Sequence, residues 1–225
     1  MTSLDSRASD TIHTSHIIHR QWLTKDTFTL ALERPPNFQY LAGQRIRLLA
    51  AGKNRDYSVI PGASQNQLAL LIRSVDNGVV STHLSRCPLG TTLDFSGPGG
   101  HFIYRPSSRP AVFVATGTGI APFAAMCRTG VKGFVILHGV RNADDLYFRG
   151  LVEPAAVRYI PCLTGEAPSL SCDAFPGRVT TYLQHQLPAG EYDFYLAGRR
   201  EMIAAVIDIV DNRFPASRVY SEIFF

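Results

Sequence analysis

The chain has 225 residues, of which 45% are hydrophobic and 18% charged, a composition typical of folded domains and unlike that of disordered chains. This length suits one large domain or two modest ones. The formal net charge is +4, and the whole excess lies in residues 1–106, which favours anionic ligands or acidic partners. The positive charges form no basic stripe, so the balance does not indicate a nucleic-acid-binding protein.

The apolar runs, such as residues 111–115 and 134–137, are far shorter than a membrane span, and the polar N-terminus lacks the apolar core of a signal peptide. The sequence therefore predicts a cytoplasmic protein. Four cysteines (Cys87, Cys127, Cys162 and Cys172) lie far apart without a CxxC pair, so we expect reduced thiols and no iron–sulfur cluster in this chain.

Three histidines, His13, His16 and His19, have a spacing that would suit a metal site on a helix. The segment instead leads into an extended run, in which side chains three apart point to opposite faces. We therefore predict no metal site.

The first half of the chain is rich in β-branched and aromatic residues separated by turn residues. Six runs are predicted as strands: residues 16–22, 27–32, 45–50, 57–60, 68–75 and 91–95. Short strands at this spacing predict a closed antiparallel sheet, either a barrel or a sandwich.

The second half alternates between strand and helix patterns. Strands are predicted at residues 111–115, 133–140, 157–163, 193–197 and 219–224, and helices at 121–128, 179–185 and 200–210. In the last helix Met202, Ala205, Val206 and Ile209 should share one face. This alternation predicts a parallel sheet covered by helices on both sides. Prolines and serines at 104–110 interrupt the pattern, so we predict domains at residues 1–106 and 107–225.

Thr116, Gly117, Thr118, Gly119, Ile120 and Pro122 belong to a glycine-rich turn between a predicted strand and helix. Glycine lets the backbone approach a ligand closely, and a helix N-terminus offers free N–H groups to an anion. A dinucleotide pyrophosphate binds at this place in a parallel sheet. The turn is not a GxGxxG fingerprint, because Pro122 stands where the third glycine would be, and a purely structural turn is the alternative.

Two segments of the first half could bind a phosphorylated cofactor. In residues 55–58, Arg55 offers a fork for phosphate oxygens, Tyr57 a ring for stacking and Ser58 a small hydroxyl. In a strand, Arg55 and Tyr57 share one face and Ser58 points to the other. The alternative is a strand with one exposed arginine and no ligand. Residues 78–82 form a glycine turn that opens a helix, where a second phosphate could bind; the alternative is that Ser81 is an ordinary N-cap.

Taken in order, these segments resemble the ferredoxin–NADP reductase family over residues 16–225. Residues 55–58 resemble its RxYS flavin motif, and residues 78–81 its GxxS segment for the flavin phosphate. Residues 117–122 resemble its nicotinamide-nucleotide loop, and residues 198–202 its second nucleotide segment. Glu222 and Phe224 resemble its acidic–aromatic ending.

The resemblance implies an antiparallel Greek-key β-barrel that binds flavin, followed by an α/β parallel-sheet domain that binds the nucleotide. It implies that Arg55 pairs with the flavin phosphate, Tyr57 stacks on the isoalloxazine and Ser58 lies near N5. Glu222 would support the hydrogen bonds around Ser58, and Phe224 would cover the flavin face that the nicotinamide must reach. The further contacts implied for the flavin are Val59, Ile72, Arg73, Gly78, Val80, Ser81 and Thr82. Those implied for the nucleotide, besides residues 116–122, are Gly139, Arg141, Gly198, Arg199 and Met202.

Two departures from the family bear on the nucleotide. Many members have a cysteine where this chain has Ala197. After residue 163, NADP-using members often place an arginine near the 2′-phosphate, whereas this chain has Thr164, Gly165 and Glu166. Because Glu166 would repel a phosphate, NADH is favoured over NADPH, with Arg141 and Arg199 as the remaining candidates for a 2′-phosphate. FAD is favoured over FMN.

The function implied is an FAD-dependent NAD(P)H oxidoreductase that exchanges electrons with a separate ferredoxin, flavodoxin or oxygenase component. Two alternatives remain open. One is a reductase of free flavin, which the retained phosphate-binding segments disfavour. The other is a non-catalytic flavin-binding electron-transfer subunit, which the intact nucleotide segments disfavour.

Overall fold

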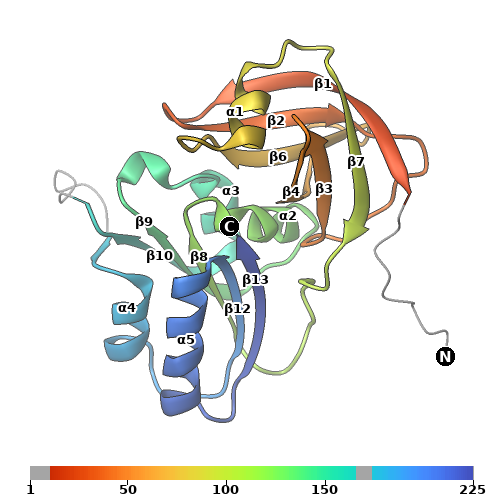
Figure 1. Cartoon of the computed structure of the whole chain (residues 1–225). Coiled ribbons are helices and arrows are strands. Elements are labelled where there is room, and N and C mark those ends of the chain that lie inside the picture. The colour runs from red at the N-terminus through yellow and green to blue at the C-terminus, as the bar shows by residue number, and fades with distance from the viewer. Residues whose placement is uncertain (1–10, 166–173, 225) are drawn as a thin grey trace, which may run out of the picture. The chain divides into compact units, whose positions relative to one another are not determined.

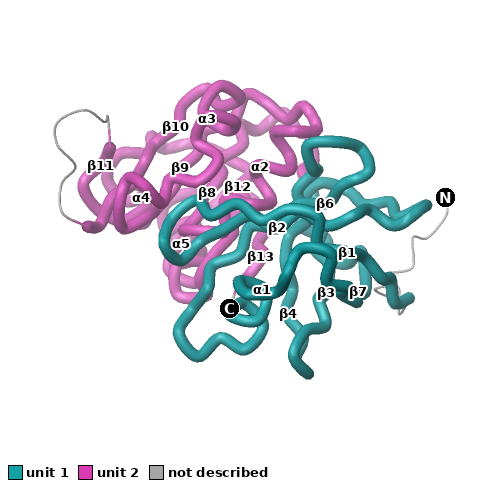
Figure 2. The backbone as a smooth tube through the Cα atoms, turned by 90° about the horizontal axis from the view of Figure 1, so that it is seen from above, with its two compact units in different colours: residues 1–103 teal, residues 104–225 magenta. Residues whose placement is uncertain are grey.

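The structure is a computed structural model that describes residues 11–165 and 174–224. The chain divides into two compact units, one ending at Ile103 and one beginning at Tyr104 (Figure 1, Figure 2). This division lies three residues before the predicted boundary between residues 106 and 107. Within the described residues, no helix combines the length and the apolar run needed to cross a bilayer.

The first unit is a curled sheet of seven strands, antiparallel throughout, with one helix. The strands are β1 (Ile12–Trp22), β2 (Thr27–Glu33), β3 (Arg45–Ala50), β4 (Lys53–Ser58), β5 (Ile60–Pro61), β6 (Gln67–Arg73) and β7 (Thr92–Gly99), and the helix is α1 (Val79–Arg86). Their order in the sheet is β4-β3-β7-β1-β2-β6-β5. The last strand, β7, returns beside β1 by a long connection, as in Greek-key barrels.

The two edges of this sheet meet at a single residue, Val59. The edge strands β4 and β5 are consecutive in the chain, and only Val59 separates them. The predicted single strand at residues 57–60 is therefore wrong: the chain leaves β3 at Ser58 and joins β6 at Ile60. The sheet accordingly closes as a barrel at this corner. The prediction also missed the start of β4, where Ala51 and Gly52 both have positive φ, 49° and 70°, as a tight hairpin turn requires.

Alternating side chains fill the barrel. In β3, Ile46, Leu48 and Ala50 are buried while the residues between them are not. Helix α1 contributes Val80 and Leu84 to the same core. The helix therefore packs on the core side of the barrel sheet.

The second unit is a six-stranded sheet, parallel throughout, in the order β11-β10-β9-β8-β12-β13. Its strands are β8 (Ala111–Thr116), β9 (Phe134–Val140), β10 (Ala156–Leu163), β11 (Phe175–Pro176), β12 (Asp193–Arg199) and β13 (Arg218–Phe224). Its α-helices are α2 (Ala121–Arg128), α3 (Arg149–Val152), α4 (Val179–His185) and α5 (Arg200–Arg213), and its 3-10 turns are η1 (Gly117–Ile120), η2 (Ala143–Asp145) and η3 (Glu153–Ala155). The predicted fold class, an antiparallel barrel followed by a parallel α/β sheet, is confirmed. The turns and the short helix between residues 143 and 155 were not predicted.

The two faces of the parallel sheet carry different side chains. On one face Phe113 stacks on Phe123 of α2 and Phe134 of β9, with ring centroids 4.6 and 4.3 Å apart. On the other, aliphatic residues such as Val112 and Val114 pack against α4 and α5. These two helices lie side by side in front of the sheet in Figure 1, while α2 and α3 lie behind it.

The buried face of α5 differs from the predicted one. The residues that the helix buries are Ile203, Val206, Ile209 and Val210, whereas the expected Met202 and Ala205 are only partly buried. Val206 and Ile209 were predicted correctly. The buried apolar stripe is therefore turned slightly from the predicted one, with Ile203 in place of Met202.

The turn after β8 approaches the end of β12 more closely than any side chain would allow. A Cβ atom on Gly119 would lie 2.2 Å from the carbonyl oxygen of Ala197, and one on Gly198 would lie 2.1 Å from Oγ1 of Thr116. Thr116 Oγ1 also accepts a hydrogen bond of 3.3 Å from the backbone N–H of Arg199. The glycine-rich turn is therefore held directly against the carboxyl end of β12.

This close approach predicts that Gly119→Ala is destabilising. The added methyl group meets backbone rather than a flexible side chain, so turn and strand must separate, at a cost of about 1–3 kcal/mol. Gly150→Ala is the matched control, because Gly150 lies in α3 with nothing within 4 Å of its Cβ position. It should leave stability unchanged or raise it by up to about 1 kcal/mol. Urea unfolding of both variants measures the difference, and equal stabilities would contradict the packing described.

Candidate functional site

Strand β4 presents Arg55 and Tyr57 on the core side of the barrel sheet. Its register pairs Arg55 with Leu48 and Tyr57 with Ile46, so these side chains share the face that carries the core. Helix α1 is a neighbour of β4 and packs into the same core. Arg55 and α1 therefore lie on the same side of β4.

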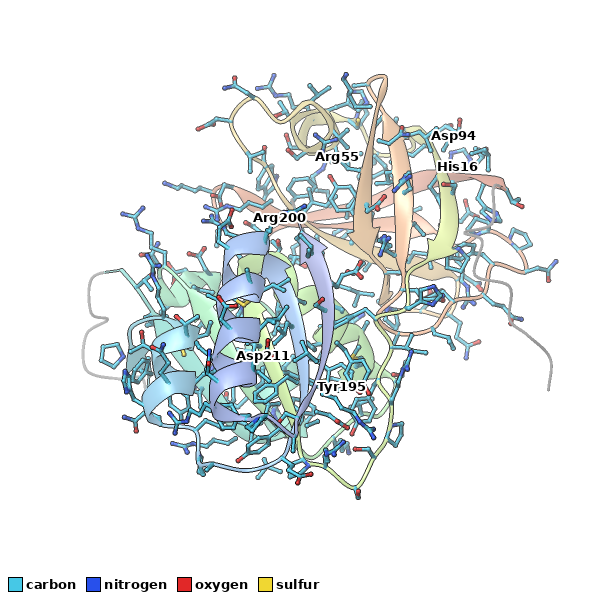
Figure 3. The ribbon with its side chains drawn as sticks, turned by 60° about the horizontal axis from the view of Figure 1, so that its bottom comes forward. His16, Arg55, Asp94, Tyr195, Arg200 and Asp211 are labelled. Carbon is cyan, nitrogen blue, oxygen red and sulfur yellow. The ribbon has the colours of Figure 1, made fainter. Side chains whose placement is uncertain are left out.

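The guanidinium of Arg55 is exposed, and its side chain is labelled in Figure 3. In the described part of the chain its one hydrogen bond goes to the carbonyl of Asn54, at 2.8 Å. The neighbouring carboxylate of Asp56 pairs instead with Arg45 and Arg47, at 3.0 and 2.7 Å. Burial would raise the pKa of Asp56, but the hydrogen bonds and charges of Arg47 and Arg45 outweigh it and lower that pKa. Arg55 thus keeps its positive charge available to an anion.

Tyr57 and Ser58 differ in their surroundings. Tyr57 is half-buried against the barrel core, and burial raises the pKa of its phenol to about 12, against the opposing charge of Arg55. Its ring is therefore neutral at physiological pH. Ser58 faces the other way and is 3% exposed, and no described residue is within hydrogen-bonding reach of its Oγ. A buried hydroxyl without a partner is costly, so this Oγ suits a ligand that completes its hydrogen bonding.

Helix α1 begins with an open N-terminus. Its N-cap is Gly78, and among the residues that the structure describes no side chain caps its first N–H groups. The alternative that Ser81 is the N-cap is wrong, since Ser81 is buried in the first turn and its Oγ accepts a hydrogen bond of 3.4 Å from the N–H of Val75. A Cβ on Gly78 would lie 2.5 Å from that Oγ, which explains the glycine. The first turn therefore offers backbone donors to an anion.

The other predicted flavin contacts are less available. Val59, Ile72 and Val80 lie in the barrel core, so only their backbone groups could meet a cofactor. Arg73 pairs with Asp26, with Nη2 and Oδ2 2.9 Å apart. Thr82, in the second turn of α1, is half-buried. An exposed arginine, a half-buried neutral ring, an unpartnered buried hydroxyl and an open helix N-terminus fit a phosphorylated flavin.

In the second unit, the predicted nucleotide residues gather at the carboxyl edge of the parallel sheet. Thr116 of β8 pairs in register with Gly139 of β9, and Ala197 of β12 with Glu222 of β13. The 3-10 turn η1 follows β8 and runs directly into α2, which has Pro122 in its first turn. Ligands bind at this edge in open parallel sheets.

The predicted nucleotide residues differ in their packing and exposure. A Cβ on Gly139 would lie 2.9 Å from Val179 of α4, so this glycine lets β9 and α4 pack closely. Met202, in the first turn of α5, is partly buried and packs against the core of this unit. Ile120 is buried, while Thr118 is half-buried. Arg141 and Arg199 are exposed, and neither guanidinium has an ion-pair partner among residues 11–165 and 174–224. Glu166, which favoured NADH, lies outside the described residues.

The two predicted catalytic residues belong to different units. Ser58 lies in the barrel, whereas Glu222 lies in β13 of the parallel sheet and is 9% exposed. Phe224, the last described residue, is half-buried at the end of the same strand. The hydrogen-bond network expected between Glu222 and Ser58 stays a prediction.

A buried histidine that the sequence did not suggest contacts the glycine turn. His138 of β9 is fully buried, with Nε2 3.2 Å from the carbonyl oxygen of Gly117 and Nδ1 2.8 Å from the hydroxyl of Tyr159. Burial lowers the pKa of His138 to about 4, against the Gly117 carbonyl and the charge of Asp145. The only signal in the sequence is a histidine inside an otherwise apolar strand.

The region around residues 142–153 and the three N-terminal histidines show no sign of a metal site. Asp145 accepts hydrogen bonds from Asn142 and Tyr147, and Glu153 pairs with Arg149 at 2.9 Å. β1 is extended from Ile12 to Trp22, so His13 and His16 point to opposite faces. In the described portion of the chain, no group of three or more histidine, cysteine or carboxylate side chains could hold a metal ion.

Two family models match the chain. Residues 15–104 match the oxidoreductase FAD-binding domain, and residues 113–208 match the oxidoreductase NAD-binding domain. Glu222 and Phe224 lie outside both ranges. The anthranilate 1,2-dioxygenase electron transfer component of Acinetobacter baylyi is 30% identical over 96% of this chain and 68% of its own length. The chain is a member of the ferredoxin–NADP reductase-type oxidoreductase family. It carries an FAD-binding and an NAD(P)-binding domain, as the sequence motifs predicted.

Further relatives agree. The toluate 1,2-dioxygenase electron transfer component of Pseudomonas putida is 33% identical over 82% of this chain, which spans only 59% of that relative. A cytochrome P450 reductase from Amycolatopsis has a TM-score of 0.83 at 25% identity, covering 99% of this chain and 73% of that structure. A ferredoxin NADP+ reductase from Neisseria gonorrhoeae, solved with FAD and NADP, has a TM-score of 0.80 at 21% identity, covering 95% and 99%, which shows the shared fold.

The buried His138 predicts a loss of stability in acid. Its pKa is about 4 when folded and 6.5 when free, so between these values the unfolded chain binds more protons than the folded one. The contribution of neutral His138 to the free energy of unfolding is fully present above pH 6.5, and it is lost as the pH falls towards 4. At pH 4.5 the loss is on the order of 2–3 kcal/mol.

Urea unfolding of the wild type and His138→Gln at pH 7.5 and pH 4.5 checks this value. Glutamine does not titrate, so the variant should not lose this contribution in acid. Between pH 7.5 and pH 4.5 the wild type should therefore lose about 2–3 kcal/mol more free energy of unfolding than His138→Gln. A difference that does not change with pH would show that His138 is not held in its neutral form.

Proposed function

We propose that this chain oxidises NADH or NADPH and passes the electrons to a separate protein. The observation that carries the proposal is that one chain combines two features. A glycine-rich turn lies at the carboxyl edge of the parallel sheet, and the barrel has an exposed arginine, a neutral ring and a buried serine hydroxyl with no partner among the described residues. When bound, FAD takes up the two electrons of a hydride and can release them singly. Relatives that bear the name of electron transfer components favour this function over reduction of free flavin.

The residues of the barrel bind and orient the flavin. Arg55 and the first N–H groups of α1 bind phosphate oxygens from the same side of β4. Tyr57 presents an uncharged ring for stacking, and Ser58 offers its buried hydroxyl for a hydrogen bond to the isoalloxazine. These contacts match FAD more closely than a loosely held flavin substrate.

The residues of the parallel sheet bind the nucleotide. The turn from Thr116 to Ile120 receives the pyrophosphate, and the segment from Gly198 to Met202 borders it at the end of β12. Glu222 and Phe224, at the end of β13, complete the site towards the nicotinamide. NADH is the preferred nucleotide, because Thr164 and Gly165 carry no charge after β10.

The partner that accepts the electrons is a separate ferredoxin, flavodoxin or oxygenase component with an acidic surface. The positive excess in residues 1–106 supports an acidic partner. Location in the cytoplasm and the absence of an iron–sulfur cluster stay predictions from the sequence.

Arg55→Ala should weaken FAD binding. A charge-assisted hydrogen bond contributes about 1.5–3 kcal/mol, so the dissociation constant should rise roughly ten- to a hundredfold in flavin titrations followed by fluorescence. Lys53→Ala removes the same charge from the same face of β4, two residues away, and should change the constant less than about threefold. Equal effects of the two variants would remove Arg55 from the phosphate site.

Ser58→Ala should slow flavin reduction without lowering the stability of the protein. Removal of an unpartnered buried hydroxyl leaves stability unchanged or slightly higher, while anaerobic flavin reduction by NADH should slow about tenfold or more with FAD retained. Ser15→Ala is the control, because Ser15 is equally buried but its Oγ donates to the carbonyl of Glu33 at 2.6 Å. That variant should lose about 1 kcal/mol of stability at an unchanged rate. Unchanged flavin reduction in Ser58→Ala would clear Ser58 of a catalytic part.

A further inference from the structure

The chemistry of its two partners determines which nitrogen of His138 carries the proton. A backbone carbonyl only accepts, so Nε2, 3.2 Å from the Gly117 oxygen, must donate a hydrogen. Nδ1 then has a free lone pair and accepts from the hydroxyl of Tyr159 at 2.8 Å. The three groups form one chain of hydrogen bonds that crosses the sheet from β10 through β9 to the turn after β8.

The surroundings of His138 favour this neutral form. The side chain is fully buried, and both of its nitrogens have partners. Three charged groups act on the hydrogen-bond chain through space. Asp145 acts on His138, and Arg149 and Glu153 act on Tyr159, with the guanidinium of Arg149 5.6 Å from the ring centre of Tyr159. Because Tyr159 and the Gly117 carbonyl are the partners of the two ring nitrogens in the described part of the chain, the hydrogen on Nε2 stays directed at Gly117.

The bond to Gly117 determines where the next N–H group points. In a trans peptide the C=O and N–H groups point in opposite directions, so a Gly117 carbonyl directed at His138 turns the N–H of Thr118 away from the sheet interior. Thr118 lies in the first turn of η1, where a backbone N–H has no partner within the helix. Gly117 has a φ of +53°, which glycine adopts without strain, so no side chain at this position restricts the orientation of the peptide. A flip of the peptide would point the N–H at His138 and remove it from the anion-binding turn.

We propose that His138 is a positioning residue for nucleotide binding: its Nε2–H bond to the Gly117 carbonyl orients the Gly117–Thr118 peptide towards the pyrophosphate, and Tyr159 selects the tautomer that makes this bond. The proposal rests on the nucleotide-binding function of this turn proposed above. It assigns a role to two residues outside every motif of the sequence.

The test compares four variants. His138→Phe removes both hydrogen bonds at similar volume, His138→Gln retains an amide donor for Gly117, and Tyr159→Phe removes only the tautomer-selecting hydroxyl. Ile136→Val is the control, because Ile136 lies on the same face of β9 two residues away, is fully buried and loses one methylene on substitution. For each variant we would measure NAD+ and NADP+ binding by calorimetry, KM and kcat of flavin reduction, FAD content, and stability in urea.

His138→Phe should raise the dissociation constant and the KM of the preferred nucleotide about five- to tenfold, with kcat within twofold and FAD content unchanged. His138→Gln should restore binding to within about twofold of the wild type, and Tyr159→Phe should weaken it two- to threefold. A purely structural histidine would instead give His138→Phe and Ile136→Val the same binding constants at equal stability, and that result would overturn the proposal. Should His138→Phe fail to fold, wild-type binding by Tyr159→Phe would overturn it equally.

Measurements on the wild-type protein distinguish failure of the positioning role of His138 from failure of the proposed function. If the wild-type protein binds neither NAD+ nor NADP+ and neither reduced nucleotide bleaches its flavin, the proposed function fails, and the role of His138 fails with it. If the wild type binds and reacts while His138→Phe behaves like the control, only the positioning role is wrong.

Discussion

The approach of the glycine turn to the end of β12 is the constraint on which the nucleotide-binding unit depends. Gly119 lies so close to the Ala197 carbonyl that a single methyl group would not fit, and Gly198 has the same relation to Thr116. Two glycines from segments about 80 residues apart are thus needed for one contact. The contact places the first turn of η1 and the carboxyl ends of β8 and β12 at one edge of the sheet, where backbone donors meet an anion.

In the barrel, the register of the strands rather than a glycine contact arranges the candidate binding groups. Its closure at Val59 ends β4 at Ser58, directly after Arg55 and Tyr57, and the register of β4 on β3 sends these two side chains to the face that α1 also covers. Asp56 is held by Arg45 and Arg47 on the other face, so it does not neutralise Arg55. One six-residue strand therefore offers a charged, an aromatic and a hydroxyl group in a defined arrangement. Each is suited to a different part of a flavin nucleotide.

How much of this could be read from the sequence depends on the range of the forces involved. Strand 45–50 and helices 121–128 and 179–185 were predicted with the bounds observed, because local apolar periodicity and turn residues define them. The break at Val59 could not be predicted, since it arises from a change of pairing partner from β3 to β6. The short elements between residues 143 and 155 have too few apolar residues to show a period.

The candidate site follows the same rule. The glycine turn and the arginine–tyrosine–serine strand have local patterns from which a binding role can be predicted, and the matched FAD-binding and NAD-binding domain models cover both segments. The contacts of His138 could not be predicted from the sequence, because they depend on the register of β9 against β8 and β10. That register places its two nitrogens beside Gly117 and Tyr159. A single histidine in an apolar strand carries no such information.

The most direct test is an absorbance spectrum of the purified protein, followed by anaerobic addition of NADH and NADPH in turn. We expect the protein to hold yellow FAD that either nucleotide bleaches, with NADH reacting faster. Bound flavin that neither nucleotide bleaches would contradict this expectation and indicate a non-catalytic flavin-binding subunit. A colourless protein that binds no added FAD would contradict it differently and indicate a reductase of free flavin.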